Sequence, residues 1–242
     1  MAYSTDCTWY VVATDSTGRS TTGPTWQFTT ELLPVAVLND PGRPSYFSGN
    51  NDNRWAEYAS ILSNDPEGRF EVGVVTDLSA ATLAPYERLV LPDNSVPDPY
   101  LDDVAAWFTP GRRIVAVDSA TCYAAYSGFM WPDSAGGHGR NVYWNYDSTA
   151  GDQEVIRLSK ATEDYAVGDV LSSWANDTQM VGALLPMDAL QLTAKASDHD
   201  WVYAAERWVG GHGSIVVLGP YSPAQSDVYA LIRDAVEGAS SP

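Results

Sequence analysis

Along most of this chain, short apolar runs alternate with segments whose apolar residues recur at helical spacing. The run at 34–38 is continuously apolar, as in a buried parallel strand, and it ends at polar, turn-forming residues. Trp55, Tyr58, Ala59 and Leu62 follow with the spacing of one helix face. The same alternation predicts strands at 70–75, 88–93, 113–118 and 214–219, and helices at 101–108 and 226–236. This order predicts an α/β domain with a doubly wound parallel sheet.

Two segments depart from this pattern. The stretch 139–205 predicts a strand around 201–205 and otherwise reads as polar loops. The first 30 residues are rich in Thr and Ser and contain two extended runs, at 9–13 and 25–29, on either side of a turn signal at 14–18. They predict a β-hairpin, which is only marginally stable alone and should therefore dock on something.

The sequences of these two runs resemble a known module. WYVVATDSTG at 9–18 and GPTWQFTT at 23–30 are similar to the last two strands of a bacterial fibronectin type III module, through the spacings W-x-V-x-A-x-D-x-x-G and W-x-F-x-T. The resemblance implies that residues 1–30 are part of such a module in a longer protein with neighbouring domains. Because bacterial modules of this type occur mostly in secreted or surface proteins, it also implies that location. The alternative is a hairpin with chance similarity.

The remaining chain, 31–242, resembles a second family. The segments YERLVLPD at 86–93, YAVGDVL at 165–171 and GHGSIVVLGP at 211–220 are similar to class I glutamine-amidotransferase-like domains. Within that group they look most like the trehalose-utilisation and β-galactosidase-trimerisation types. The resemblance implies a flavodoxin-like α/β domain over 31–242.

The turn after the fourth predicted strand departs from this family's catalytic motif. The family places a nucleophilic cysteine there in a Gly-x-Cys-x-Gly elbow, whose glycines permit a strained backbone. In the sequence VDSATCYAA at 117–125, Ser119 or Ala120 falls at the cysteine position and Cys122 comes two or three residues later, with neither glycine present. We therefore expect no amidotransferase activity. Ser119 and Cys122 are candidate nucleophiles, with the alternative that Cys122 is a small buried hydrophobic residue.

A hydrolase would also need a general base. Of the three histidines, His138 is the best candidate, because it lies in a glycine-rich loop after the elbow helix. The alternative is that His138 is an ordinary histidine of a surface loop, without a catalytic role. The family's His–Glu dyad has no match at 219–222.

Three predicted strands are followed by an acid. Asp40, Asp93 and Asp118 should meet at the carboxyl edge of a parallel sheet, where open α/β sheets bind their ligands. Carboxylates in close proximity either raise one another's pKa or recruit a cation, and an all-oxygen site suits Ca²⁺ or Mg²⁺. The alternative is that each Asp caps the following turn. Nothing in the sequence predicts an organic cofactor.

The amino-acid composition limits the classes of partner that the chain can bind. The chain has 242 residues, with 31 acidic against 13 basic side chains and a formal charge of −18. Nucleic acids and anionic membranes bind clustered Lys and Arg, so we expect neither as a partner. The N-terminal residues lack the pattern of a signal peptide, and no apolar run is long enough to span a bilayer. Cys7 and Cys122 fit neither a disulfide framework nor a zinc site.

These features predict an extracellular amidotransferase-like domain without the family's Cys–His–Glu site, acting as a non-catalytic module that binds carbohydrate or a partner domain. The nine tryptophans could stack on sugar rings if exposed. The alternative function is a divalent-cation-dependent hydrolase of an ester, lactone or related acyl bond. There, Asp40, Asp93 and Asp118 would hold the metal, and Ser119 or water would attack with His138 as base. The unpartnered hairpin also makes a homodimer a candidate assembly.

Overall fold

A parallel sheet forms the centre of the chain. The computed structural model describes residues 6–29, 31–40, 54–92, 96–134, 144–147, 152–157, 165–172, 177–219 and 226–238. The parallel strands are β3 (Leu33–Leu38), β4 (Phe70–Val75), β5 (Arg88–Pro92), β6 (Arg113–Val117) and β13 (Ser214–Leu218). Their order in the sheet is β4-β3-β5-β6-β13, with every neighbouring pair parallel. This is the flavodoxin-like order, and it confirms the fold class predicted from the sequence.

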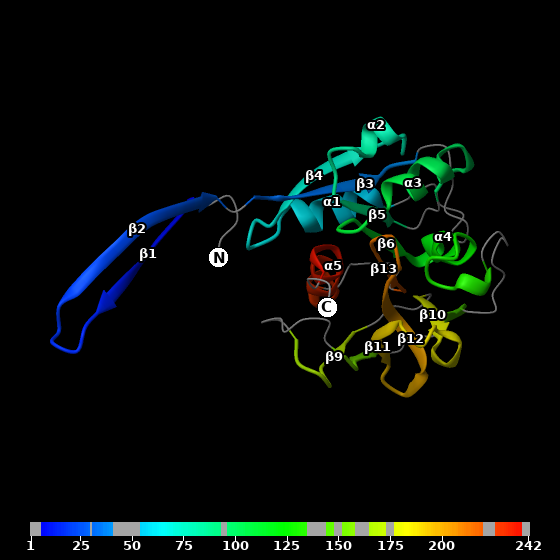
Figure 1. Cartoon of the computed structure of the whole chain (residues 1–242). Coiled ribbons are helices and arrows are strands. Elements are labelled where there is room, and N and C mark those ends of the chain that lie inside the picture. Colours follow the sequence, from blue (N-terminus) through cyan, green and yellow to red (C-terminus); the bar gives the residue numbers. More distant parts are fainter. Residues whose placement is uncertain are drawn as a thin grey trace.

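Helices cover both faces of this sheet (Figure 1). One face packs against α2 (Ala80–Leu83), α3 (Leu101–Trp107) and α4 (Thr121–Tyr126), the other against α1 (Trp55–Ser63) and α5 (Ser226–Glu237). The central strands β5 and β6 are almost entirely buried, which explains their uninterrupted apolar sequences. Within the described ranges, no helix has the length and apolar character that a membrane span requires.

The second half of the sheet is antiparallel. From β13 the sheet continues through β12 (Asp198–Trp208), β11 (Leu190–Lys195), β8 (Gln153–Val155) and β9 (Val170–Leu171). A side branch pairs β12 with β10 (Asp177–Val181), which in turn pairs with β7 (Trp144–Asp147). The sequence predicted only the strand around 201–205 of this region. The strands β7, β8, β9 and β10 are short and pair with segments that are not adjacent in sequence, so they leave little local signal. By contrast, the alternating run LQLTAK of β11 and its tight turn into β12 are a local hairpin signal that sequence reasoning missed.

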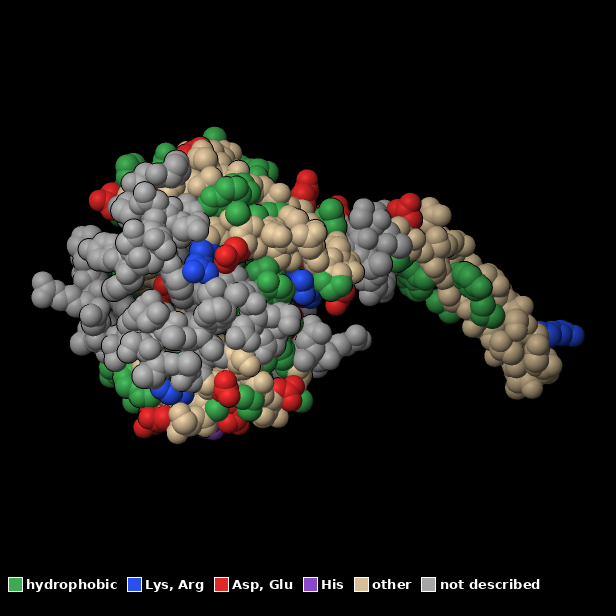
Figure 2. Space-filling view, turned by 180° about the vertical axis from the view of Figure 1, so that it is seen from behind, with side chains coloured by type: hydrophobic (Ala, Val, Ile, Leu, Met, Phe, Trp, Pro, Cys, Tyr) green, Lys and Arg blue, Asp and Glu red, His purple; other side chains and the backbone are tan. Residues whose placement is uncertain are grey.

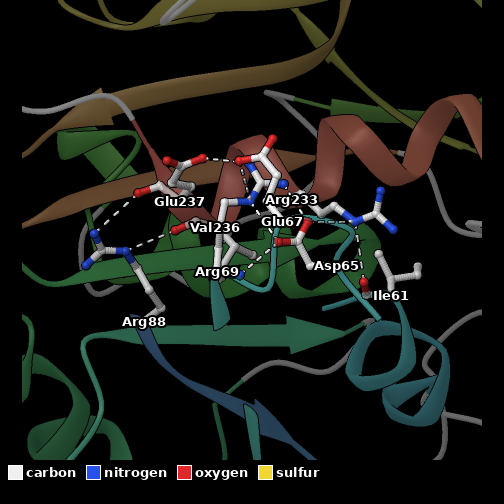
Figure 3. A network of polar contacts seen from close by, with 8 residues as sticks. All are labelled: Ile61, Asp65, Glu67, Arg69, Arg88, Arg233, Val236 and Glu237. Atoms are coloured by element: carbon white, nitrogen blue, oxygen red, sulfur yellow. Dashed lines mark hydrogen bonds and ion pairs between the residues drawn. The ribbon is translucent and has the colours of Figure 1, made fainter. Parts of the chain in front are cut away.

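Buried charges attach α5 to the amino edge of the sheet (Figure 3). Arg69 donates to the Asp65 carboxylate, from Nη2 at 2.7 Å and Nε at 2.9 Å, and to Glu237 at 2.8 Å. Arg233 of α5 also faces Asp65, with Nε 3.4 Å from Oδ1. Arg88 adds a hydrogen bond to the main-chain oxygen of Val236 at 3.0 Å. The end of α5 is therefore held by side chains from the loop between α1 and β4 and from β5.

The N-terminal segment is a hairpin of β1 (Asp6–Thr14) and β2 (Ser20–Thr29), as predicted. It projects from the α/β domain in both Figure 1 and Figure 2. Trp9 pairs with Trp26 across the strands, and their rings stack with centroids 4.4 Å apart. Trp9 and Val11 on one face, and Tyr10 and Val12 on the other, are all about half exposed. The hairpin therefore leaves apolar side chains uncovered on both faces.

Candidate functional site

The strand order places the candidate acids at one edge of the sheet. It reverses between β3 and β5, so the crevice at the carboxyl ends of these strands is the switch point where such folds bind ligands. Asp40 follows β3 and Asp118 follows β6, both at this edge. Asp93, which follows β5, lies outside the described residues.

Asp118 occupies the elbow between β6 and α4. The backbone turns through a short 3-10 segment at Asp118–Ala120 before α4 begins at Thr121. Asp118 has a φ of 46°, in the left-handed region that non-glycine residues rarely adopt, and its side chain is completely buried. Asp tolerates this conformation better than most residues, so the turn forms without the glycines of the family motif. The left-handed residue of this elbow is thus Asp118, one position before Ser119.

The two candidate nucleophiles next to this turn are poorly placed for attack. Ser119 is only 7% exposed. Burial raises the pKa of the Cys122 thiol, and the nearby charge of Asp118 raises it further. Because the thiolate is the reactive form of cysteine, these surroundings keep Cys122 unreactive at neutral pH. Cys7 and Cys122 are not joined in a disulfide.

The described histidines have other partners. His199 Nε2 lies 3.0 Å from a carboxylate oxygen of Glu154 on β8. His212, in the turn before β13, donates from Nδ1 to the main-chain oxygen of Phe108 at 2.8 Å. His138 lies outside the described residues. The described part of the chain therefore supplies no histidine that activates Ser119 or Cys122.

The acids after β3 and β6 are separated by β5. Neighbouring strands lie about 4.8 Å apart, and Asp93 is the residue that follows this middle strand in the sequence. No group of three His, Cys, Asp or Glu side chains suited to a metal occurs within the described ranges. The predicted metal site at Asp40, Asp93 and Asp118 therefore stays a prediction that depends on Asp93.

A hollow lies between α3 and α4, and sequence reasoning missed it. Its volume is about 510 Å³, within the roughly 300–1,000 Å³ typical of ligand pockets. We call it the α3–α4 cavity; its lining includes Asp102, Ala105, Tyr123, Tyr126, Phe129 and His212. The spacing of Tyr123, Tyr126 and Phe129 at i, i+3 and i+6 was the only sequence signal, and it is equally typical of a core stripe.

Comparisons with known proteins found similarity among solved structures only. No family model and no curated protein matches the chain. Among solved structures, an exo-β-1,4-mannosidase, Op5Man5, from Opitutaceae bacterium strain TAV5 aligns with a TM-score of 0.46 and 12% identity. The alignment covers 83% of this chain and 33% of the mannosidase, so the chain spans about a third of that protein's length.

A putative ThuA-like protein from Bacteroides uniformis ATCC 8492 aligns over more of its own length. The TM-score is 0.51 at 12% identity, with 84% of this chain and 89% of that protein covered. At this identity the likeness concerns the fold alone. It agrees with the flavodoxin-like architecture predicted for residues 31–242, while the amidotransferase and fibronectin resemblances stay predictions.

Proposed function

We propose that this amidotransferase-like domain is a non-catalytic accessory module that binds carbohydrate or a partner domain. One observation carries the proposal: the elbow, where the family has its nucleophilic cysteine, holds the fully buried carboxyl side chain of Asp118. A nucleophile at this turn has to be exposed to substrate and paired with a base.

The surroundings of the elbow support this proposal. Acyl transfer needs a nucleophile within hydrogen-bond reach of its base, and a third group that orients the base. Ser119 is buried, the Cys122 pKa is raised, and the described histidines bond to Glu154 and to the Phe108 carbonyl. None of these arrangements activates a nucleophile.

The second candidate function is a hydrolase of an ester, lactone or related acyl bond that depends on Ca²⁺ or Mg²⁺. The left-handed φ of Asp118 favours it, because non-glycine residues in strained conformations cluster at functional sites. In this alternative Asp40, Asp93 and Asp118 hold the cation, and His138 acts as base toward Ser119 or water.

Turnover assays separate the two functions. The whole chain is incubated with aryl esters and lactones in Ca²⁺ or Mg²⁺, and again in EDTA, beside Asp118→Asn, since Asn tolerates the left-handed backbone. We expect no hydrolysis above buffer in any sample. Hydrolysis that both EDTA and Asp118→Asn abolish would overturn the accessory role and establish the metal-dependent one.

We also propose that the module works beside neighbouring domains of a secreted or cell-surface protein. The fibronectin type III resemblance of residues 1–30 supports this, together with the uncovered apolar faces of the hairpin. The same faces support a homodimer as the assembly of the isolated chain.

A further inference from the structure

We propose that the α3–α4 cavity is a binding site for neutral carbohydrate, accommodating one or two pyranose rings. This inference rests on the proposed binding role and gives it a site and a ligand class. The site is distinct from the elbow, because the cavity opens between two helices that cover one face of the sheet.

The Tyr123 hydroxyl is the first reason. Tyr123 lines the cavity, yet only 1% of the residue is exposed, and its hydroxyl has no hydrogen-bond partner among the residues that the structure describes. A buried polar group without a partner costs about 1–3 kcal/mol, so such groups are normally satisfied. Burial also raises the pKa of Tyr123, so the hydroxyl stays protonated and can donate to a ligand oxygen. Because the hydroxyl is buried, a small movement of the cavity wall would bring it within reach of a ligand hydroxyl that satisfies it.

Aromatic rings make up much of the cavity wall. Tyr123 meets Tyr126 and Phe129 edge-on, with centroids 5.4 Å and 6.1 Å apart. The His212 ring packs at 5.2 Å from Phe129 and stacks on Phe108 at 5.7 Å. Aromatic side chains of this kind can stack on the C–H face of a sugar ring, which is the apolar half of carbohydrate recognition.

The polar groups of the wall are mostly acceptors. The Nδ1–H of His212 donates to the Phe108 carbonyl, so Nε2 is the ring nitrogen left to hydrogen-bond a ligand. Asp102 adds a carboxylate that can accept two hydroxyl protons. Acceptors beside aromatic faces suit a polyol. The carboxylate and the formal charge of −18 disfavour an anionic ligand.

The wall is held in place by contacts outside the cavity. Arg207 of β12 donates from Nη1 to the main-chain oxygen of Phe129 at 2.7 Å and pairs with Asp188 at 2.9 Å. Tyr126 donates to the main-chain oxygen of Val96 at 3.3 Å. A wall held in this way needs only small movements to admit a ligand, which lowers the entropic cost of binding.

Calorimetric titration with maltose and cellobiose tests the proposal on the whole chain. We expect saturable binding of at least one disaccharide. Tyr123→Phe, which removes only the hydroxyl, should weaken it about tenfold, the loss of one buried hydrogen bond. Ala105→Leu, which fills the cavity from α3, should abolish disaccharide binding.

The matched control is Tyr229→Phe, on α5 at the opposite face of the sheet, which should leave the affinity unchanged. Because the cavity disfavours anions, glucuronic acid should bind more weakly than glucose.

The possible failures are distinguishable. Both variants are first shown to be folded by circular dichroism. If they then bind the disaccharide as tightly as wild type, this site is wrong and the proposed binding role still stands. If Ala105→Leu does not fold, Tyr123→Phe alone decides in the same way. A folded wild-type chain that binds neither disaccharide overturns both the site and carbohydrate as the ligand class. Hydrolysis of either sugar would instead contradict the non-catalytic role.

Discussion

Arg113 and Glu206 form an ion pair inside the α/β domain. Their side chains are 3% and 0% exposed, and Nη1 lies 2.6 Å from Oε1. Arg113 also donates to the Ser214 hydroxyl at 2.8 Å and to the main-chain oxygen of Ala235 in α5. Burial lowers the pKa of Arg113, and the charge of Glu206 opposes this change. The pair therefore links β6, β12, β13 and α5 through one guanidinium.

Replacing one member of this pair should be costly. We expect Glu206→Gln to lower the free energy of unfolding by about 3–5 kcal/mol, because it leaves the Arg113 charge buried without its counter-ion. Urea denaturation measures the loss. The control is Asp188→Asn, which breaks an ion pair whose carboxylate is 58% exposed and should cost about 0–1 kcal/mol. Equal losses in the two variants would contradict a special role for burial.

Asp65 predicts a pH dependence of stability. Burial by itself would raise its pKa, but the hydrogen bonds from Arg69 and the charges of Arg69 and Arg233 outweigh burial, so the pKa is lowered from its usual 3.8. A carboxyl whose pKa is lower in the folded state stabilises the fold above its unfolded pKa and loses that contribution as the pH falls through the folded value.

We therefore expect Asp65→Asn to be destabilised relative to wild type at pH 7, with the difference shrinking as the pH falls below about 4. Thermal unfolding of both proteins from pH 7 to pH 2.5 tests this. A difference that is independent of pH would show that lost packing, and not the carboxylate charge, explains the effect. Hydrogen bonds from Arg207 also lower the pKa of the exposed Asp188 carboxyl, so Asp188→Asn should show a smaller difference with the same dependence on pH.

At the scale of elements, the turn between β12 and β13 requires a glycine for space. A Cβ on Gly213 would lie 1.9 Å from the main-chain oxygen of Arg112, whereas a Cβ on Gly210 would meet nothing within 4 Å. The turn carries His212 into the α3–α4 cavity and leads directly into β13. The close approach of the Gly213 and Arg112 backbones thus fixes the position of both β13 and the cavity residue His212.

Gly213→Ala should destabilise the fold by about 2 kcal/mol or more, because the backbone of Arg112 has to move. Gly210→Ala, three residues earlier in the same turn, should change stability by no more than about 0.5 kcal/mol. Chemical denaturation of the two variants gives the comparison. Similar stabilities for both would mean that the turn relaxes freely around the added methyl group.

At the scale of the whole molecule, the exposed hairpin is the most unusual feature. Trp9 and Trp26 are 49% and 40% exposed, and the hairpin projects away from the α/β domain (Figure 2). Uncovered apolar faces on paired strands favour association with another chain or domain. This is the property expected of strands that belong to a larger sandwich, and it bears on the proposed partners.

We expect the isolated chain to self-associate with increasing concentration, and the double variant Trp9→Ser/Trp26→Ser to associate less. Sedimentation velocity over a range of concentrations measures both. Leu184→Ser removes an apolar side chain that is 46% exposed elsewhere on the surface and should not change association. Association that the double variant leaves unaltered would remove the hairpin from the proposed dimer interface.

Much of the architecture follows from local sequence. The runs at 34–38, 70–75 and 88–92 are strands because they are short, apolar and bounded by polar residues, and the spacing from Trp55 to Leu62 predicts α1. The hairpin was equally readable from its alternation and its turn. These features depend on neighbours in the sequence, so the sequence by itself determines them, including the flavodoxin-like class.

Tertiary structure decided the rest, because the deciding contacts join residues far apart in the chain. The short antiparallel strands β7, β8, β9 and β10 are set by pairing with distant segments and not by local pattern. The burial and left-handed backbone of Asp118 follow from packing around the elbow, which the motif spacing could not reveal. The α3–α4 cavity arises where α4 and the turn at His212 meet α3, over a separation of about a hundred residues. The sequence supplied the acids and aromatic residues, and only folding determined which of them face solvent, one another or a ligand.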